Sequence, residues 1–163
     1  MARIYKTKYF LVFLFLALFF LNCKEKKQQS EGMDLMKYGI PYTIKAPTDA
    51  KATQTQSGYL TNVNISDGKF YEVQVFMADA NTADLKKLKQ EHKEILIMHP
   101  AFSKIIEEFD NGFIFEKQED DGTKSYDFYI VKIVGNNEIS FIGGNTHYFT
   151  EDQVKKMVKS ILY

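Results

Sequence analysis

Short turn sequences divide the C-terminal part of the chain into apolar segments. Each turn combines glycine with Asp or Asn, the residue types that accept the left-handed backbone of tight hairpins. The four turns are Ser66-Asp67-Gly68-Lys69, Asp110-Asn111-Gly112, Asp120-Asp121-Gly122 and Gly135-Asn136-Asn137. Because a tight turn joins antiparallel neighbours, this pattern predicts an antiparallel sheet.

The segments between the turns have the alternating or continuous apolar pattern of strands. We expect strands over residues 38–46, 59–65, 70–77, about 104–109, 113–117, 125–134 and 138–143. Pro41 places the first of these at a sheet edge, since proline cannot donate to a ladder. The polar segment 48–57 is predicted to be a loop. Residues 102–109 also fit a helical period, and a short helical turn is expected over 100–103.

Two segments have helical spacing. The first begins after Asn81, which suits an N-cap, and ends before Pro100. Its predicted buried stripe is Leu85, Leu88, His92, Ile95, Leu96 and His99. The last helix begins with a capping box of Thr150 and Gln153, and its stripe is Val154, Met157, Val158, Ile161 and Leu162. The predicted fold class is α+β, an antiparallel sheet of about six to seven strands packed by two amphipathic helices.

This order of elements, the proline-containing first strand and the aromatic-rich segment 111–115 resemble the PsbP-like family of small α+β domains. Members of that family serve as accessory or assembly factors. The resemblance, over about residues 38–162, implies a role of that kind and assigns no functional residue.

The N-terminus has the pattern of a signal peptide. Arg3, Lys6 and Lys8 precede an apolar run of 13 residues, 9–21. A helix over this run reaches only about 20 Å, whereas a spanning helix needs about 30 Å. A positive segment followed by a short apolar run is typical of a secretory signal.

Cys23, the one cysteine of the chain, follows this run and resembles the lipidation site of bacterial lipoprotein precursors. In that family the sulfur receives a diacylglyceryl group and the preceding peptide is removed. Phe20 and Asn22 stand where the family usually has Leu and a small residue. The resemblance implies a signal peptide over 1–22 and a membrane attachment through lipid on Cys23. An uncleaved anchor and an ordinary secreted protein are the alternatives.

The residues after Cys23 are polar and have no apolar period. We expect a lipidated cysteine and flexible tether over 23–36 and a single domain over 37–163. Lys24 stands where lipoproteins of the inner membrane commonly have Asp. This favours the outer membrane of the cell envelope over the inner one and leaves open whether the domain faces the periplasm or the surface.

The charge pattern argues against a nucleic-acid partner. The chain has 21 basic and 21 acidic residues, and removing residues 1–22 leaves 18 basic against 21 acidic. Arg3, the one arginine, leaves with the signal peptide. Because Arg clamps phosphate and carboxylate in bidentate pairs, its absence lowers the odds of a nucleotide or phosphate site.

His92, His99 and His147 are the candidate catalytic or metal-ligating residues. His92 and His99 lie seven residues apart on one helix, about 10.5 Å along its axis, which is too far to share a small ion easily. No zinc spacing or metalloprotease motif accompanies them. We therefore expect His92 to be a half-buried core residue and His99 a charge near the helix end, and we predict no metal or cofactor.

Three further patterns have weaker functional interpretations. Acidic residues around two turns could hold Ca²⁺ or a basic partner, but they lack the spacing of a calcium loop and are expected to be solvated. They are Glu107, Glu108, Asp110, Glu116, Glu119, Asp120 and Asp121. Lysines 86, 87, 89 and 93 could touch an anionic membrane, and 143–146 could hold an anion. A solvated helix face and a simple turn are the expected structures there.

No catalytic motif stands out, so the sequence favours a non-enzymatic role. We expect a lipid-anchored envelope protein that binds a protein partner or assists assembly. One alternative is a ligand-binding protein or hydrolase that uses His92 or His147 with nearby acids. Another is a surface inhibitor or immunity-type protein.

Overall fold

The computed structural model describes residues 32–57 and 60–163. Within these residues, a sheet of seven strands has the spatial order β3-β4-β5-β9-β8-β7-β6, with every neighbouring pair antiparallel. The strands are β3 (Lys51–Ser57), β4 (Leu60–Ser66), β5 (Glu72–Asp79), β6 (Phe102–Phe109), β7 (Gly112–Gln118), β8 (Lys124–Val134) and β9 (Asn137–Gly143). Two helices, α2 (Leu85–Ile97) and α3 (Glu151–Leu162), pack on it. The predicted α+β class is confirmed.

A small N-terminal unit precedes this sheet. It consists of β1 (Met33–Asp34), the 3-10 turn η2 (Met36–Tyr38) and β2 (Thr43–Ile44), and β1 pairs antiparallel with β2. Leu35, between β1 and η2, is fully buried in the main core. The folded part therefore includes residues 33–36, which the sequence analysis assigned to the tether.

The turn between β4 and β5 is built as its sequence predicts. Gly68 has a left-handed backbone, with φ of 75°. The Asp67 carboxylate accepts hydrogen bonds from the backbone N–H groups of Lys69, Phe70 and Tyr71, at 2.8, 2.9 and 3.0 Å. These bonds fix the loop that leads into β5.

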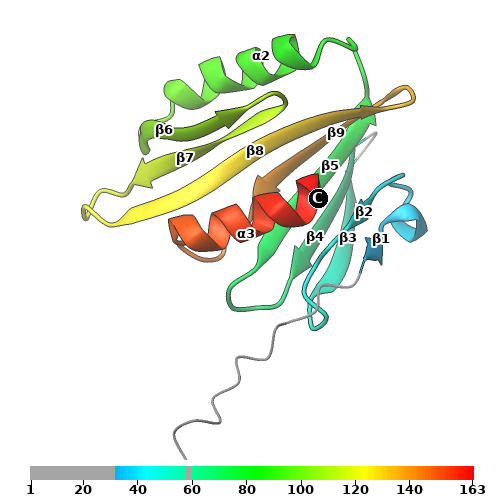
Figure 1. Cartoon of the computed structure of the whole chain (residues 1–163), viewed down its shortest axis with the longest axis horizontal. Coiled ribbons are helices and arrows are strands. Elements are labelled where there is room, and N and C mark those ends of the chain that lie inside the picture. Colours follow the sequence, from blue (N-terminus) through cyan, green and yellow to red (C-terminus); the bar gives the residue numbers. More distant parts are fainter. Residues whose placement is uncertain (1–31, 58–59) are drawn as a thin grey trace, which may run out of the picture.

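α3 and the N-terminal unit cover one face of the sheet (Figure 1). The capping box of Thr150 and Gln153 is confirmed, and it sets the start of the helix. Four residues of α3 enter the core, where they meet alternate residues of β4, β5, β7, β8 and β9. They are Val154, Met157, Val158 and Ile161. This face holds the larger of the two cores.

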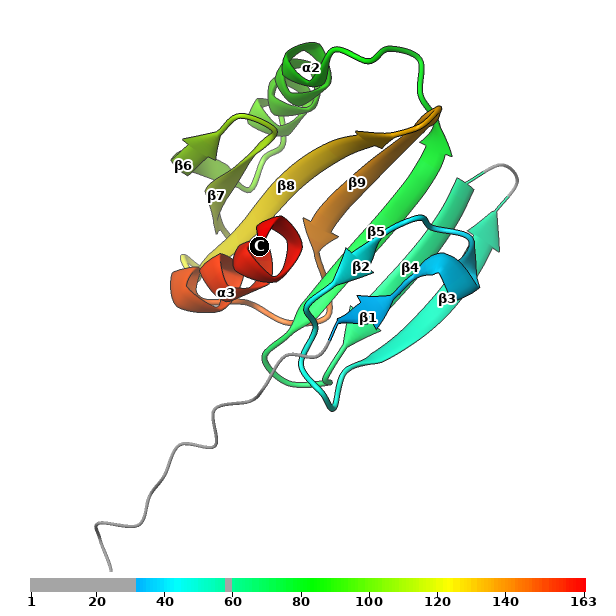
Figure 2. The same ribbon diagram turned by 45° about the vertical axis from the view of Figure 1, so that its right-hand side comes forward.

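α2 packs on the opposite face and covers the side formed by β6, β7 and β8 (Figure 2). Successive residues of a strand point to opposite faces, so Phe113 and Tyr129 pack under α2 while Ile114 and Phe128 enter the larger core. Leu88 is the one buried residue of α2. Ile95, predicted to belong to the buried stripe, is exposed instead.

Three local predictions differ from the structure. The segment 51–57, predicted to be a loop, forms the edge strand β3, because an edge strand with one neighbour tolerates polar residues on both sides. The strand predicted over 38–46 is reduced to β2, since η2 turns the chain at Gly39. β6 begins at Phe102, so the helical alternative for 102–109 is wrong.

The beginning of α2 is set by side-chain hydrogen bonds that residue spacing alone does not reveal. Asp84, and not Asn81, is the N-cap, and its carboxylate accepts hydrogen bonds from the N–H groups of Lys86 and Lys87. In the described ranges, no helix is both long and apolar enough to cross a membrane.

Candidate functional site

The residue with the most specific predicted chemistry cannot be placed. Cys23 lies outside the described residues, together with the whole predicted signal peptide. In residues 32–57 and 60–163, no three His, Cys, Asp or Glu side chains are grouped so that they could hold a metal ion. The remaining candidates are single side chains and pairs.

His92 is a packing residue. Its ring stacks on Tyr129, with 3.6 Å between ring centroids and 5° between planes, and it lies 6.3 Å from the ring of Phe113. Burial lowers the pKa of His92 below its usual value. The predicted half-buried core histidine is therefore found, in an apolar environment that disfavours the charged form of its imidazole.

The other two histidines lie in separate loops. His99 follows α2 and is exposed, and its Nδ1 accepts a hydrogen bond from the N–H of Ala101 at 3.2 Å. His147 lies in the loop between β9 and α3. The structure does not bring the three histidines together, so they do not form a shared site.

His147 lies beside a buried carboxylate that the sequence analysis did not single out. Glu72, at the start of β5, is only 1% exposed. Its carboxylate accepts hydrogen bonds from Asn64 Nδ2 at 3.2 Å and from the Thr146 hydroxyl, and it lies 3.7 Å from His147 Nδ1. Thr146 Oγ1 is also 2.7 Å from His147 Nδ1. A glutamate, a hydroxyl and an imidazole thus form one contiguous polar group.

Among the described residues no lysine lies within ion-pairing distance of Glu72, so His147 is its one possible cationic partner there. The side chain of His147 is 43% exposed, which leaves part of the imidazole open to solvent. A buried carboxylate is costly without a partner, and it fixes the orientation of a neighbouring imidazole. The Glu72–His147 pair therefore combines a buried carboxylate with a partly exposed imidazole.

Gly144 makes room for Glu72. A Cβ at Gly144 would lie less than 3.0 Å from the Cγ, Cδ and Oε2 atoms of the Glu72 side chain. The N–H of Gly144 donates to the backbone carbonyl of Glu72 at 3.0 Å. The N–H of Gly143 likewise donates to Asp127 Oδ1 at 2.9 Å, so both of these N–H groups in the loop 143–146 are already used within the protein.

The sheet face beside Glu72 is polar. Asn62 and Asn64 of β4 each bury a side-chain oxygen that has no hydrogen-bond partner. Gln74 of β5 reaches Asn145 of the same loop at 3.5 Å. The smaller core under α2 does not extend to these residues, so the face is left for polar contacts.

The predicted acidic cluster does not exist as one site. Glu108 pairs with Lys93 at 2.7 Å and with Lys89 at 3.2 Å, and these hydrogen bonds hold the pKa of Glu108 below its usual value. Glu116 is buried and pairs with Lys124 at 3.2 Å. Both carboxylates cross-link elements, but only Glu116 departs from the expected solvated state, because the side chain of Glu108 is 40% exposed. Lys89 and Lys93 are likewise used to hold α2 on β6.

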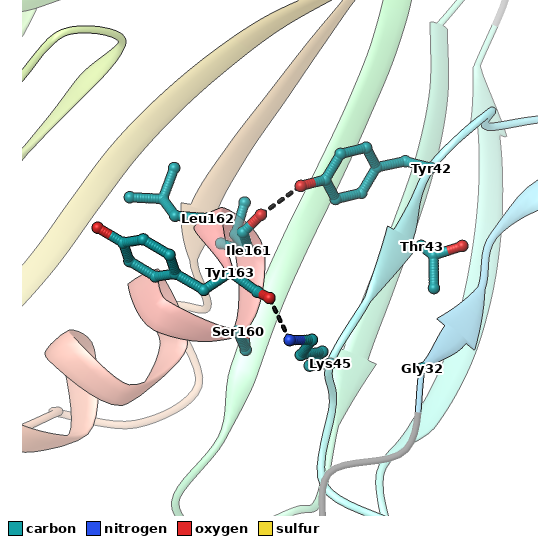
Figure 3. A pocket seen from close by; sticks show the side chains of 8 residues that line it. All are labelled: Gly32, Tyr42, Thr43, Lys45, Ser160, Ile161, Leu162 and Tyr163. Atoms are coloured by element: carbon teal, nitrogen blue, oxygen red, sulfur yellow. Dashed lines mark hydrogen bonds between the residues drawn. The ribbon is translucent and has the colours of Figure 1, made fainter.

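A pocket of about 400 Å³ lies between β2 and the end of α3 (Figure 3). It is lined by Gly32, Tyr42, Thr43, Lys45, Ser160, Ile161, Leu162 and Tyr163. The last carbonyls of α3 are satisfied here: Ser160 accepts from the Lys45 N–H at 2.9 Å, Ile161 accepts from the Tyr42 hydroxyl, and Tyr163 accepts from the Lys45 ammonium. The polar groups of this pocket thus cap the helix.

The end of α2 exposes apolar side chains. Ile95, Ile97 and Met98 are 64%, 50% and 76% exposed, and we call these three residues the α2 end cluster. Positions 95 and 98 are neighbours on one side of a helix. Helical spacing placed Ile95 in the core and therefore did not indicate this cluster. The run Ile95-Leu96-Ile97-Met98 does indicate it, because one side of a helix cannot bury four consecutive residues.

Comparisons of the chain with protein-family models, with curated proteins and with solved structures find no match.

Proposed function

We propose that the protein is a lipid-anchored domain of the bacterial cell envelope, held at the outer membrane through Cys23, that binds a protein partner without catalysing a reaction. The α2 end cluster is the observation that carries the binding role. α3 buries four of its apolar residues, whereas α2 buries one and leaves three large ones in solvent. Clustered exposed apolar residues are typical of interaction sites.

The surroundings of the cluster support a protein partner. Lys86 and Lys87 balance Glu91 and Glu94 on the exposed side of α2, so this surface has no strong net charge. A neutral surface with an apolar end is typical of protein–protein contacts and unsuited to nucleic acid. The ion pairs of Lys89 and Lys93 with Glu108 hold the helix in place without using the cluster.

The lipid anchor is supported by the sequence around Cys23, which follows a positive segment and a short apolar run. Among the described residues, the first strand begins at Met33, ten residues after Cys23. Intact mass of the wild-type chain from the membrane fraction tests the anchor. A mature chain that begins at Asn22 or earlier with a free thiol would contradict it, and Cys23→Ser is expected to release the domain from the membrane.

Site-specific photo-crosslinking in intact cells tests the binding role. A photoreactive residue in place of Met98 is expected to capture one reproducible protein, identified by mass spectrometry. The same residue in place of Lys156, on the exposed side of α3, is the matched control and is expected to capture none. Equal capture at both positions, or none at Met98, would refute the proposed interface.

A second candidate function, a ligand-binding or hydrolytic site, is favoured by one observation: the contact of the His147 imidazole with Glu72. A carboxylate that orients an imidazole can prepare it to act as a general base. A thermal-shift screen of small ligands tests this candidate. A ligand that stabilises the wild type and not His147→Ala, with little change in the melting temperature of the variant itself, would establish it.

A further inference from the structure

One end of the domain exposes two aromatic side chains. Phe70 follows the β4–β5 turn and Tyr148 lies in the loop between β9 and α3, and each is 65% exposed. The hydrogen bonds from Phe70 and Tyr71 to Asp67 fix this backbone. Tyr71 is buried, whereas Phe70, in the bend that precedes it, is directed into solvent.

These residues lie near the point where the tether joins the domain. Gly32 lines the pocket together with Ser160, and the Ser160 hydroxyl is 2.9 Å from that of Tyr71, the neighbour of Phe70. Figures 1 and 2 show the β4–β5 turn and the beginning of β1 at the same lower end of the molecule, with α2 at the upper end. Tyr148 follows His147, which contacts the start of β5 at this same end.

The length of the tether limits which end can meet the membrane. Nine residues, 24–32, follow Cys23. They reach about 30 Å when fully extended and span about 17 Å as a flexible chain. A domain of this size is about 36 Å across. The end near Gly32 is therefore within ordinary reach of the bilayer, whereas placing α2, at the opposite end, on the bilayer would require the tether to be fully extended or longer.

We propose that this end of the domain, formed by Lys51, Lys69, Phe70 and Tyr148 and called the tether-side edge, lies against the lipid bilayer and orients the domain. The inference rests on the proposed lipid anchor. Aromatic side chains prefer the boundary between headgroups and acyl chains. The lysines extend their ammonium groups toward lipid phosphates while their stems remain over apolar surface.

The aromatic side chains, and not net charge, provide most of the contact. Asp49 lies two residues before Lys51 and Asp67 two residues before Lys69, so the edge is close to neutral. The contact is therefore expected on zwitterionic as well as anionic vesicles and to change little with added salt.

The absence of tryptophan from the chain allows a direct test. The full lipidated chain carrying Phe70→Trp is reconstituted into phosphatidylcholine vesicles that contain brominated acyl chains, which quench nearby indole. Met98→Trp, at the exposed end of α2, is the matched control. Flotation of the vesicles measures attachment separately from quenching.

Flotation with a blue shift and strong quenching for Phe70→Trp, and neither change for Met98→Trp, would support the inference. Flotation without quenching at Phe70→Trp, or with equal quenching at both positions, would overturn the inference and leave the anchor intact. Failure of the lipidated chain to float would overturn the anchor and the inference with it.

Discussion

Gly144→Ala is the sharpest test of the arrangement around Glu72. The added methyl carbon would approach three atoms of the Glu72 side chain to less than 3.0 Å, a distance that real contacts do not show. Glu72 cannot swing freely into solvent because it is 1% exposed and held by Asn64 and Thr146. The substitution must therefore displace the carboxylate or separate the loop from β5.

The free-energy cost of either response can be estimated. Forcing extra volume into a packed site costs about 1–3 kcal/mol. Leaving a buried polar group without its hydrogen bonds costs about 1–3 kcal/mol. We expect Gly144→Ala to lower the free energy of unfolding by about 3 kcal/mol, a large part of the 5–15 kcal/mol that domains typically have.

Urea denaturation at pH 7 of the chain lacking residues 1–23 measures this loss. The double variant Glu72→Ala/Gly144→Ala supplies the control, because removing the carboxylate removes the clash. In the Glu72→Ala background the alanine at 144 is expected to cost less than about 1 kcal/mol. A small loss in the wild-type background, or an equal loss in both, would refute the reasoning.

Three further substitutions test the cores and the helix cap. Met157→Ala removes a fully buried side chain and should lower the free energy of unfolding, measured by urea denaturation, by about 2–5 kcal/mol. Ile95→Ala, in the exposed α2 end cluster, should change it by less than about 0.5 kcal/mol. Similar costs for the two variants would contradict the assignment of the two helix faces. Tyr42→Phe leaves the Ile161 carbonyl without its donor and should cost about 1 kcal/mol, seen as a lower urea midpoint; an unchanged midpoint would contradict this cap. Because burial lowers the pKa of His92, the unfolded chain binds its proton first as the pH falls below about 6.5, so wild-type stability should decline there. His92→Phe should remove that part of the decline in denaturation series from pH 7 to 5, and identical pH curves would show that His92 does not cause it.

The elements that local rules determine were predictable. The Asp67-Gly68 turn and the Thr150 and Gln153 capping box each depend on bonds within a few residues, so the sequence indicates them directly. The edge strand β3 was not predictable, because its side chains are polar. It is a strand because its backbone pairs with β4. Leu35 joins the core through the same kind of long-range contact.

The polar group around Glu72 also depends on long-range contacts. Glu72 and Thr146 lie far apart in the chain and meet because β5 pairs with β9, which brings the following loop over the start of β5. A glutamate at the start of a strand does not by itself indicate a site. The sequence predicts Gly144 to be a turn residue, and only the structure shows that it lies against the Glu72 carboxylate. His92, by contrast, was predictable, since its place in an apolar helix stripe already indicates a packed ring.

The two proposed contacts place a constraint on the partner. The described part of the chain begins, just before β1, at the same end of the domain as the β4–β5 turn, while α2 lies at the opposite end (Figure 1). If the tether-side edge rests on the bilayer, the α2 end cluster is directed away from it by about the diameter of the domain, about 36 Å. A protein embedded flush in the same membrane cannot reach that cluster. The partner captured at Met98 should therefore be a soluble protein or one with a domain projecting well beyond the membrane surface.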